Sequence, residues 1–332
     1  MHSLNTALLN LPFTDLEILM YRWALDLPHR YHSAERVGQA MDRGLDVVAF
    51  STPQRFEGPW DNYQCKQLRR TLGEPSLFGE VGKTLYYASR GEFTPPAAYV
   101  FIAPYGVAQS ARVYLGQPSR FRRTMLDEWD KRCAKQIAKG TAVAMDDQLR
   151  STIEAYDFGR IDGWNADRIL AQESMQAVLV KTFEIDPGSA LERPVPGEFQ
   201  EHEATYVDQL VGVYGEHSGL IFSDADAVLG HEEHGVHLRD QRVRYFAAAD
   251  FKAHFKESVL ETLLTDLDDN IYHGVVDGLR SRKGLDRVDA AMSQAAVLAV
   301  PGPFGKHNRA TIKVRQGTCH HLVNAGRLRW RP

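Results

Sequence analysis

Residues 60–66 of the chain read Trp-Asp-Asn-Tyr-Gln-Cys-Lys, and an earlier apolar run at residues 46–50 reads Asp-Val-Val-Ala-Phe. The earlier run has the valine and phenylalanine content of a buried strand. Residues 51–59, between the two, contain two prolines and a glycine, which is typical of a hairpin turn. Because side chains alternate along a strand, Gln64 and Lys66 are predicted to share one face of the second strand.

An acid, an amide and a lysine are therefore expected at one end of the hairpin. Asp46 begins the first strand, and Gln64 and Lys66 lie at the end of the second. Carboxylate and amide oxygens are ligands of Mg²⁺, and a metal ion with a lysine beside it can act on a phosphodiester. The alternative is an ordinary hairpin with a polar face, because these three residue types are common on protein surfaces.

The spacing of these residues resembles the active-site motif PD-(D/E)XK of the restriction-endonuclease-like fold. In many Mrr-like and Cap-type double-strand DNA endonucleases, glutamine replaces the middle acid, which gives G-x-D followed by Q-x-K. The chain has Gly44-Leu45-Asp46 and Gln64-Cys65-Lys66 at the corresponding places. That family also has a glutamate on its first helix, in a Phe-Glu-x-Leu pattern. Glu17 lies in a similar stretch, with Asp15 as the alternative.

The resemblance implies a set of ligands for Mg²⁺, for which Mn²⁺ can substitute. Glu17, Asp46, Gln64 and the backbone carbonyl of Cys65 would surround the ion. Lys66 would orient or activate the attacking water and stabilise the charge that builds on the phosphate. A neutral amide attracts Mg²⁺ less than a carboxylate does, so the glutamine implies a low metal affinity or a degenerate site.

Length and composition indicate a two-domain globular protein. The chain has 332 residues, of which 43% are hydrophobic and 25% charged. Its three cysteines, Cys65, Cys133 and Cys319, are widely spaced and form no CxxC pair, so we expect reduced thiols in the cytoplasm. The first ten residues lack the features of a signal peptide, and no run of about 18 apolar residues predicts a membrane span.

The charge distribution is more informative than the net charge. The net charge of −4 provides no overall attraction to nucleic acid. Residues 119–139, however, contain seven Lys or Arg against three acids. We predict that Arg120, Arg122 and Arg123 in this cluster contact DNA phosphates, because clustered cations neutralise a phosphate backbone. The alternative is a solvated face or a contact with another protein.

A change in composition divides the chain. Residues 186–200 are rich in proline and glycine and predict a linker between a first domain at 1–185 and a helical second domain at 201–332. The first domain is predicted to be α/β (α+β), with a restriction-endonuclease-like mixed sheet flanked by helices. The elements predicted around the hairpin are helices at 13–27 and near 78–88, a strand at 97–103, and mostly helical structure at 118–183.

The last third resembles the C-terminal domains of ABC-three-component systems. Residues 239–245 are similar to the start of the motif R-x-Q-R…Y-x-A-x-x-L, and residues 319–330 are similar to C-H-x-L-x-N-x-G-x-L-x-W. In those systems, of which Lamassu is the best-known kind, this domain joins an effector to an SMC-like ATPase and a small middle subunit. We expect apolar side chains around Tyr245, Phe246 and Phe255 to form the docking surface. The alternative is a plain helical domain in which Arg, Tyr and Trp fasten helices together.

Other catalytic and metal motifs are weak or absent. His231 and His234 are three residues apart rather than the four of HExxH, and Gly230 and Gly235 disfavour a helix there, so a zinc site is a minor alternative. The sequence contains neither G-x-S-x-G nor G-x-x-x-x-G-K-[ST]. Neither a hydrolase elbow nor ATP binding through a P-loop is therefore predicted, and any ATPase would be a separate subunit.

The two resemblances together imply an effector nuclease of a prokaryotic antiviral defence complex. It would cut double-stranded DNA with Mg²⁺ and stay inactive until the SMC-like ATPase senses aberrant DNA. Since one site of this fold cuts one strand, we expect self-association in the active state. The alternatives are a catalytically inactive DNA-binding or scaffold subunit of such a complex, and a stand-alone Mrr-like restriction nuclease.

Overall fold

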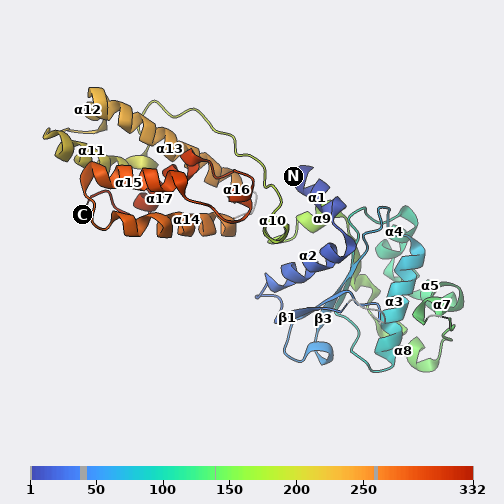
Figure 1. Ribbon diagram of the computed structural model, residues 1–332. Helices are drawn as coiled ribbons and strands as arrows, with labels where there is room; N and C mark the ends of the chain where they lie inside the picture. Colours follow the sequence, from blue (N-terminus) through green and yellow to red (C-terminus); the bar gives the residue numbers. More distant parts are fainter. Residues whose placement is uncertain (1, 38–42, 139, 258–260, 332) are drawn as a thin grey trace. The chain divides into compact units, whose positions relative to one another are not determined.

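The computed structural model describes residues 2–37, 43–138, 140–257 and 261–331. The chain forms two compact units, Met1–Thr182 and Phe183–Pro332 (Figure 1). Residues 185–200 contain neither helix nor strand and belong to the second unit, where they bond to other parts of it. Arg193 pairs with Asp250, and Asp186 pairs with Arg309. None of the described helices is long and apolar enough to span a membrane.

The first unit contains a five-stranded mixed sheet with the order β1-β2-β3-β4-β5. The predicted hairpin is present, because Val47 pairs with Tyr63 and Phe50 pairs with Trp60 in antiparallel register. β1 is antiparallel to β2, whereas β3, β4 and β5 are parallel to one another. The predicted α/β class with a mixed sheet flanked by helices is therefore confirmed. The strands are β1 (Ser33–Arg36), β2 (Val47–Phe50), β3 (Trp60–Cys65), β4 (Ala98–Ile102) and β5 (Ile161–Trp164).

Helices cover both faces of this sheet (Figure 1). On one face, the Trp23 ring of α2 meets the Tyr63 ring of β3 edge-on, with the ring centroids 5.3 Å apart. On the other face, α3 buries Phe78, Val81 and Leu85 in a large apolar cluster. The helices of this unit are α1 (His2–Asn10), α2 (Phe13–Leu25), α3 (Glu74–Ser89), α4 (Gln109–Gly116), α5 (Pro118–Asp127), α6 (Trp129–Arg132), α7 (Ala134–Ile137), α8 (Asp147–Ala155), α9 (Ala166–Leu170) and α10 (Met175–Phe183).

One strand lies inside the region that the sequence predicts to be mostly helical. β5 is only four residues long and contains Gly163, so it offers too little alternation to be recognised as a strand. Glycine is needed there because a Cβ at position 163 would lie 2.6 Å from the side chain of Val107. β5 extends the parallel part of the sheet beyond the predicted hairpin and strand.

The second unit is helical and has two helices at its centre, α13 (Glu232–Glu257) and α17 (Ile312–Asn324). They approach closely at Gly317, where a Cβ would lie 1.9 Å from the backbone oxygen of Arg244. The remaining helices of the unit are α11 (Ala204–Ser218), α12 (Ala225–Leu229), α14 (Glu261–Val276), α15 (Gly284–Val297) and α16 (Gly302–Lys306).

The expected docking surface around Tyr245, Phe246 and Phe255 is wrong. All three side chains are buried, with relative exposures of 2%, 9% and 0%. Tyr245 stacks on His321 of α17, and Phe255 meets the ring of Phe304. The apolar stripe that the sequence shows on α13 therefore packs inside this unit.

Residues of the C-terminal motif connect the helices through buried polar contacts. Arg242 donates to both carboxylate oxygens of Glu203, and the relative exposures of the two residues are 4% and 0%. Gln241 accepts a hydrogen bond from His320 of α17, with 2.9 Å between the Gln241 Oε1 and the His320 Nε2. These contacts fit the alternative in which the motif residues fasten helices together.

We predict that Arg242→Ala destabilises the second unit by about 3–5 kcal/mol, because it leaves the buried Glu203 carboxylate without its cation. Hydrogen–deuterium exchange of the full-length protein should show faster exchange of the amides of α11 and α13. Arg239→Ala is the matched control, since Arg239 is exposed on the same helix. Equal protection of α13 in the wild type and in Arg242→Ala would contradict the prediction.

Candidate active site

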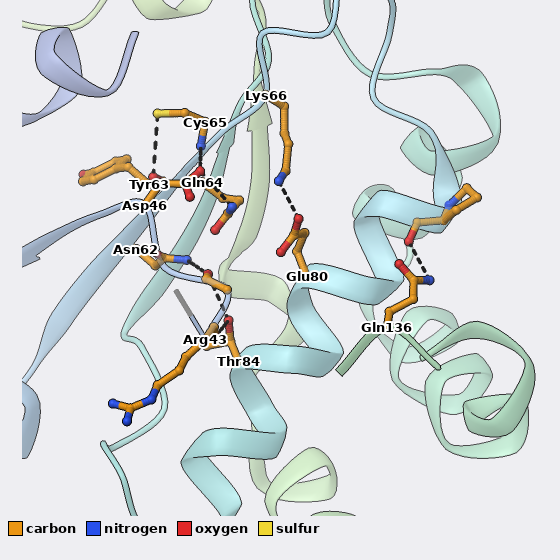
Figure 2. Close-up of polar contacts among 12 residues, drawn as sticks. Arg43, Asp46, Asn62, Tyr63, Gln64, Cys65, Lys66, Glu80, Thr84 and Gln136 are labelled. Atoms are coloured by element: carbon orange, nitrogen blue, oxygen red, sulfur yellow. Dashed lines mark hydrogen bonds and ion pairs between the residues drawn. The ribbon is translucent and has the colours of Figure 1, made fainter. Parts of the chain in front are cut away.

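Asp46 lies immediately before β2, at the end of the hairpin. Its relative exposure is 3%, and its Oδ2 accepts hydrogen bonds from the Gln64 Nε2 at 2.8 Å and the Cys65 backbone N at 2.7 Å (Figure 2). Its backbone oxygen accepts from the amide of Val37, beyond the end of β1. Beyond the last pair of β2 and β3, the Cys65 N–H has no backbone acceptor on β2, and the Asp46 carboxylate accepts its hydrogen bond instead. This hydrogen bond holds the Asp46 side chain at the end of the strand.

Gln64 is buried between Asp46 and Tyr99. The Tyr99 hydroxyl donates to the Gln64 Oε1 at 3.3 Å, while the Gln64 amide nitrogen faces Asp46. A rotation of the amide by half a turn would direct its oxygen toward Asp46 and its nitrogen toward Tyr99, whose hydroxyl can also accept. Gln64 can therefore donate to the acid or share a cation with it.

Lys66 lies just past the end of β3, and its ammonium pairs with Glu80 of α3. The Nζ–Oε1 distance is 2.5 Å, and the two side chains are 14% and 22% exposed (Figure 2). Glu80 is not among the site residues predicted from the sequence. The feature of the sequence that points to Glu80 is its helical spacing, because Glu80 and Thr84 are one turn apart on α3. Thr84 lies on the same side, where its hydroxyl donates to the Gly44 carbonyl at the start of the hairpin.

Glu17 of α2 is buried, with 4% exposure, and its carboxylate accepts from Arg36 of β1 at 2.9 Å. It is close enough for its charge to raise the pKa of Asp46. The structure therefore brings the predicted helix glutamate near the site but neutralises it with an arginine. The described ion pair uses the Glu17 Oε2, so Oε1 takes no part in it.

The backbone carbonyl of Gly44 is a fixed point of the site. It accepts from the Asn62 Nδ2 at 3.0 Å and the Thr84 Oγ1 at 3.2 Å, and it lies 3.2 Å from the Tyr99 Oη, whose single proton it shares with the Gln64 Oε1. The φ of Gly44 is +81°, a conformation that L side chains rarely adopt, and a Cβ there would lie 2.6 Å from the Thr84 Oγ1. These contacts hold the segment that leads into Asp46 between β3, β4 and α3.

Burial is the main reason that the pKa of Asp46 is raised, from its usual 3.8 to about 7. The charge of Lys66 and the hydrogen bond from the Cys65 amide lower it, whereas the charges of Glu80 and Glu17 raise it. A carboxyl that titrates near neutral pH inside a cluster of charged groups is typical of functional sites.

The side chains present can provide oxygen donors for a divalent cation. Both hydrogen bonds described for Asp46 use Oδ2, so Oδ1 takes part in neither. This oxygen, a rotated Gln64 amide and the Cys65 carbonyl are hard ligands of the kind that Mg²⁺ and Mn²⁺ accept. Across the described ranges, no three His, Cys, Asp or Glu side chains are grouped closely enough to hold a metal. Binding by this set would thus depend on one acid, an amide and a carbonyl.

The predicted DNA-contacting arginines lie on α5. None of their described contacts is with Asp46, Gln64 or Lys66. Arg122 donates to the backbone oxygen of Tyr156 at 2.9 Å and lies over the Phe158 ring. Arg120 bonds to Gln117 and lies over the Tyr114 ring. Only Arg123 is both exposed and without a described partner. DNA contact by these three residues stays a prediction.

The histidines of the zinc alternative are packing residues. His234 is 1% exposed and stacks between His231 and Tyr214, with ring centroids 4.6 and 4.9 Å away. Burial is the largest cause of its lowered pKa. These contacts account for the histidines in the core of the second unit.

We predict that Asp46→Asn stabilises the first unit at pH 8, because the folded protein binds the Asp46 proton up to about pH 7 and the unfolded chain releases it near pH 4. The free energy of unfolding therefore falls as pH rises through this window. A pKa difference of this size is worth at most about 4 kcal/mol. The single oxygen of Asn can accept both hydrogen bonds that Oδ2 accepts.

Calorimetric melting of the wild type and Asp46→Asn should show a difference that widens from pH 5 to pH 8. Asp61→Asn is the matched control on β3, since Asp61 is also buried but accepts from Arg30 and Tyr31. This control should melt lower than the wild type at pH 8. An Asp46→Asn protein that melts lower than the wild type at pH 8 would show that the buried carboxylate is a stabilising structural group.

Comparison with known proteins gives one match, in the second unit. Residues 203–330 match CTD6, the C-terminal domain 6 of the ABC-three component (ABC-3C) systems. No curated protein and no solved structure matches the chain. The matched residues include both parts of the motif identified above, from Arg239 to Trp330. The match supports membership of the chain in an ABC-three component system.

Proposed function

We propose that the chain is the nuclease effector of an ABC-three component defence complex and that its first unit is a metal-dependent DNA endonuclease. The observation that supports this most strongly is the placement of Asp46, Gln64 and Lys66 at one end of a buried hairpin. The C-terminal match supports the membership in the complex. It therefore favours a subunit of such a complex over a stand-alone restriction nuclease.

Each residue of the site has a role in this proposal. Asp46, Gln64 and the Cys65 carbonyl would hold Mg²⁺ or Mn²⁺, with Glu17 as a further ligand. The ion would supply a Lewis acid at the scissile phosphate of double-stranded DNA. Lys66 would position the attacking water and stabilise charge on the phosphate, because its ammonium lies at the same end of β3.

The contacts within the site suit an enzyme that is inactive at rest. The ammonium of Lys66 is paired with Glu80, and the Asp46 Oδ2 is occupied by two N–H donors. Catalysis would require the lysine to turn from Glu80 toward a phosphate. We propose that an SMC-like ATPase and a small middle subunit control this release when the ATPase senses aberrant DNA. Two copies would then associate to cut both strands.

A catalytically inactive DNA-binding or scaffold subunit is the second candidate. Its supporting observation is that the polar groups of the site satisfy one another, and that Glu17 is neutralised by Arg36. A glutamine in place of a second acid also fits this candidate, because it lowers the attraction for a divalent cation. The two candidates differ in whether Lys66 is needed for DNA cleavage.

We predict that Lys66→Ala abolishes cleavage of plasmid DNA by the full-length protein with Mg²⁺ or Mn²⁺. Losing Lys66 removes several kcal/mol of transition-state stabilisation, which is on the order of a thousandfold or more in rate. Cell toxicity of the expressed effector should disappear with it. Lys181→Ala, at an exposed lysine on α10, is the control and should cut as the wild type does.

Two outcomes of this assay would reject parts of the proposal. Cleavage by Lys66→Ala at the wild-type rate would show that the site is assigned to the wrong residues. No cleavage by the wild type with either metal, alone or in the assembled complex, would favour the scaffold candidate.

A further inference from the structure

The segment that follows Lys66 is a basic loop beside the candidate site. Residues 66–73 read Lys-Gln-Leu-Arg-Arg-Thr-Leu-Gly and contain no acid. Arg69 and Arg70 are exposed, and neither has a described hydrogen bond or ion pair. They differ in this respect from Arg36, Arg132 and Lys66, each of which is paired with a glutamate.

Both ends of this loop are fixed to the first unit. At the start, the Gln67 Nε2 donates to the backbone oxygens of Leu8, Leu9 and Leu11, at 3.2, 2.9 and 2.8 Å. At the end, Leu72 is fully buried and exchanges backbone hydrogen bonds with the segment around Val107. Residues 68–71, the exposed tip of the loop, therefore lie between two segments that are held in place.

The backbone at the tip is in an uncommon conformation. Arg69 has a φ of +49°, in the left-handed region where glycine and asparagine are favoured and a long side chain is unusual. Such conformations concentrate at sites that bind ligands. The conformation turns the chain so that two adjacent arginines occupy the exposed tip.

We infer that the loop at residues 66–73 binds the phosphate backbone of DNA next to the phosphodiester that Lys66 would engage. Arg69 and Arg70 lie three and four residues after Lys66, so their Cα atoms are within roughly 14 Å of its Cα. Phosphates follow one another at about 3.4 Å of axial rise along each strand. The two guanidiniums can therefore contact phosphates a few steps from the one at Lys66, and each provides the fork of donors that suits a phosphate.

This inference rests on the proposed function for its ligand, DNA. The positive charge of the loop supports the inference independently of the proposed function, because residues 66–73 contain three cations and no acid. The α5 arginines have protein partners at two of three positions, so they are less available for this role. The loop is thus a DNA-contacting element distinct from the α5 arginines predicted from the sequence.

The test is the salt dependence of DNA binding by the full-length protein in EDTA, where binding is measured without cleavage. Removing two phosphate contacts with Arg69→Ala/Arg70→Ala should lower the slope of log affinity against log salt by about 1.8. Arg150→Ala/Arg160→Ala makes the same change in charge at two exposed arginines of α8 and the turn after it, and should leave the slope unchanged. Arg69→Lys/Arg70→Lys should recover most of the slope.

Equal slopes for the wild type and Arg69→Ala/Arg70→Ala would overturn the inference, as would a wild type that binds no DNA at low salt. A reduced slope in a protein that never cleaves DNA would support the loop and reject the nuclease. Cleavage by the wild type, together with equal slopes for the wild type and Arg69→Ala/Arg70→Ala, would support the nuclease and reject the loop. The two proposals can therefore fail separately.

Discussion

The hydrogen bond from the Cys65 amide to the Asp46 carboxylate is the contact on which the candidate site depends. The pairing of β2 with β3 ends at Val47 and Tyr63. The Cys65 N–H, two residues further along β3, would otherwise be buried without an acceptor. A carboxylate that replaces a backbone acceptor is fixed in position by the sheet itself. Because side chains alternate along β3, Gln64 and Lys66, the neighbours of Cys65, lie on the opposite face from the Cys65 side chain.

The cost of this arrangement is electrostatic. Burial raises the pKa of Asp46 to about 7, and the nearby charges of Glu80 and Glu17 add to this effect. Lys66 compensates in part, but its ammonium is paired directly with Glu80 rather than with Asp46. A divalent cation beside Asp46 would relieve the same repulsion. The protein therefore combines a buried acid, which costs stability, with side chains that a cation or a phosphate could draw into new pairs.

The sequence was sufficient to predict the hairpin and the common face of Gln64 and Lys66, because both follow from strand alternation and a proline-rich turn. Glu80 could not be predicted, since the sequence does not specify which face of α3 meets the end of β3. β5 was missed because four residues with a central glycine show no usable period. The error at Tyr245 has another cause: an apolar stripe shows that a helix face is covered, but the sequence does not show that α17 of the same unit covers it.

The central claim is that Asp46 and Gln64 together bind a divalent cation. Calorimetric titration of Mn²⁺ at pH 8 into the wild type, Asp46→Asn and Gln64→Glu tests it most directly, because it requires neither DNA nor partner subunits. The account predicts measurable binding by the wild type, none by Asp46→Asn, and tighter binding by Gln64→Glu, which adds a second carboxylate. Equal Mn²⁺ affinity in the wild type and Asp46→Asn would contradict it.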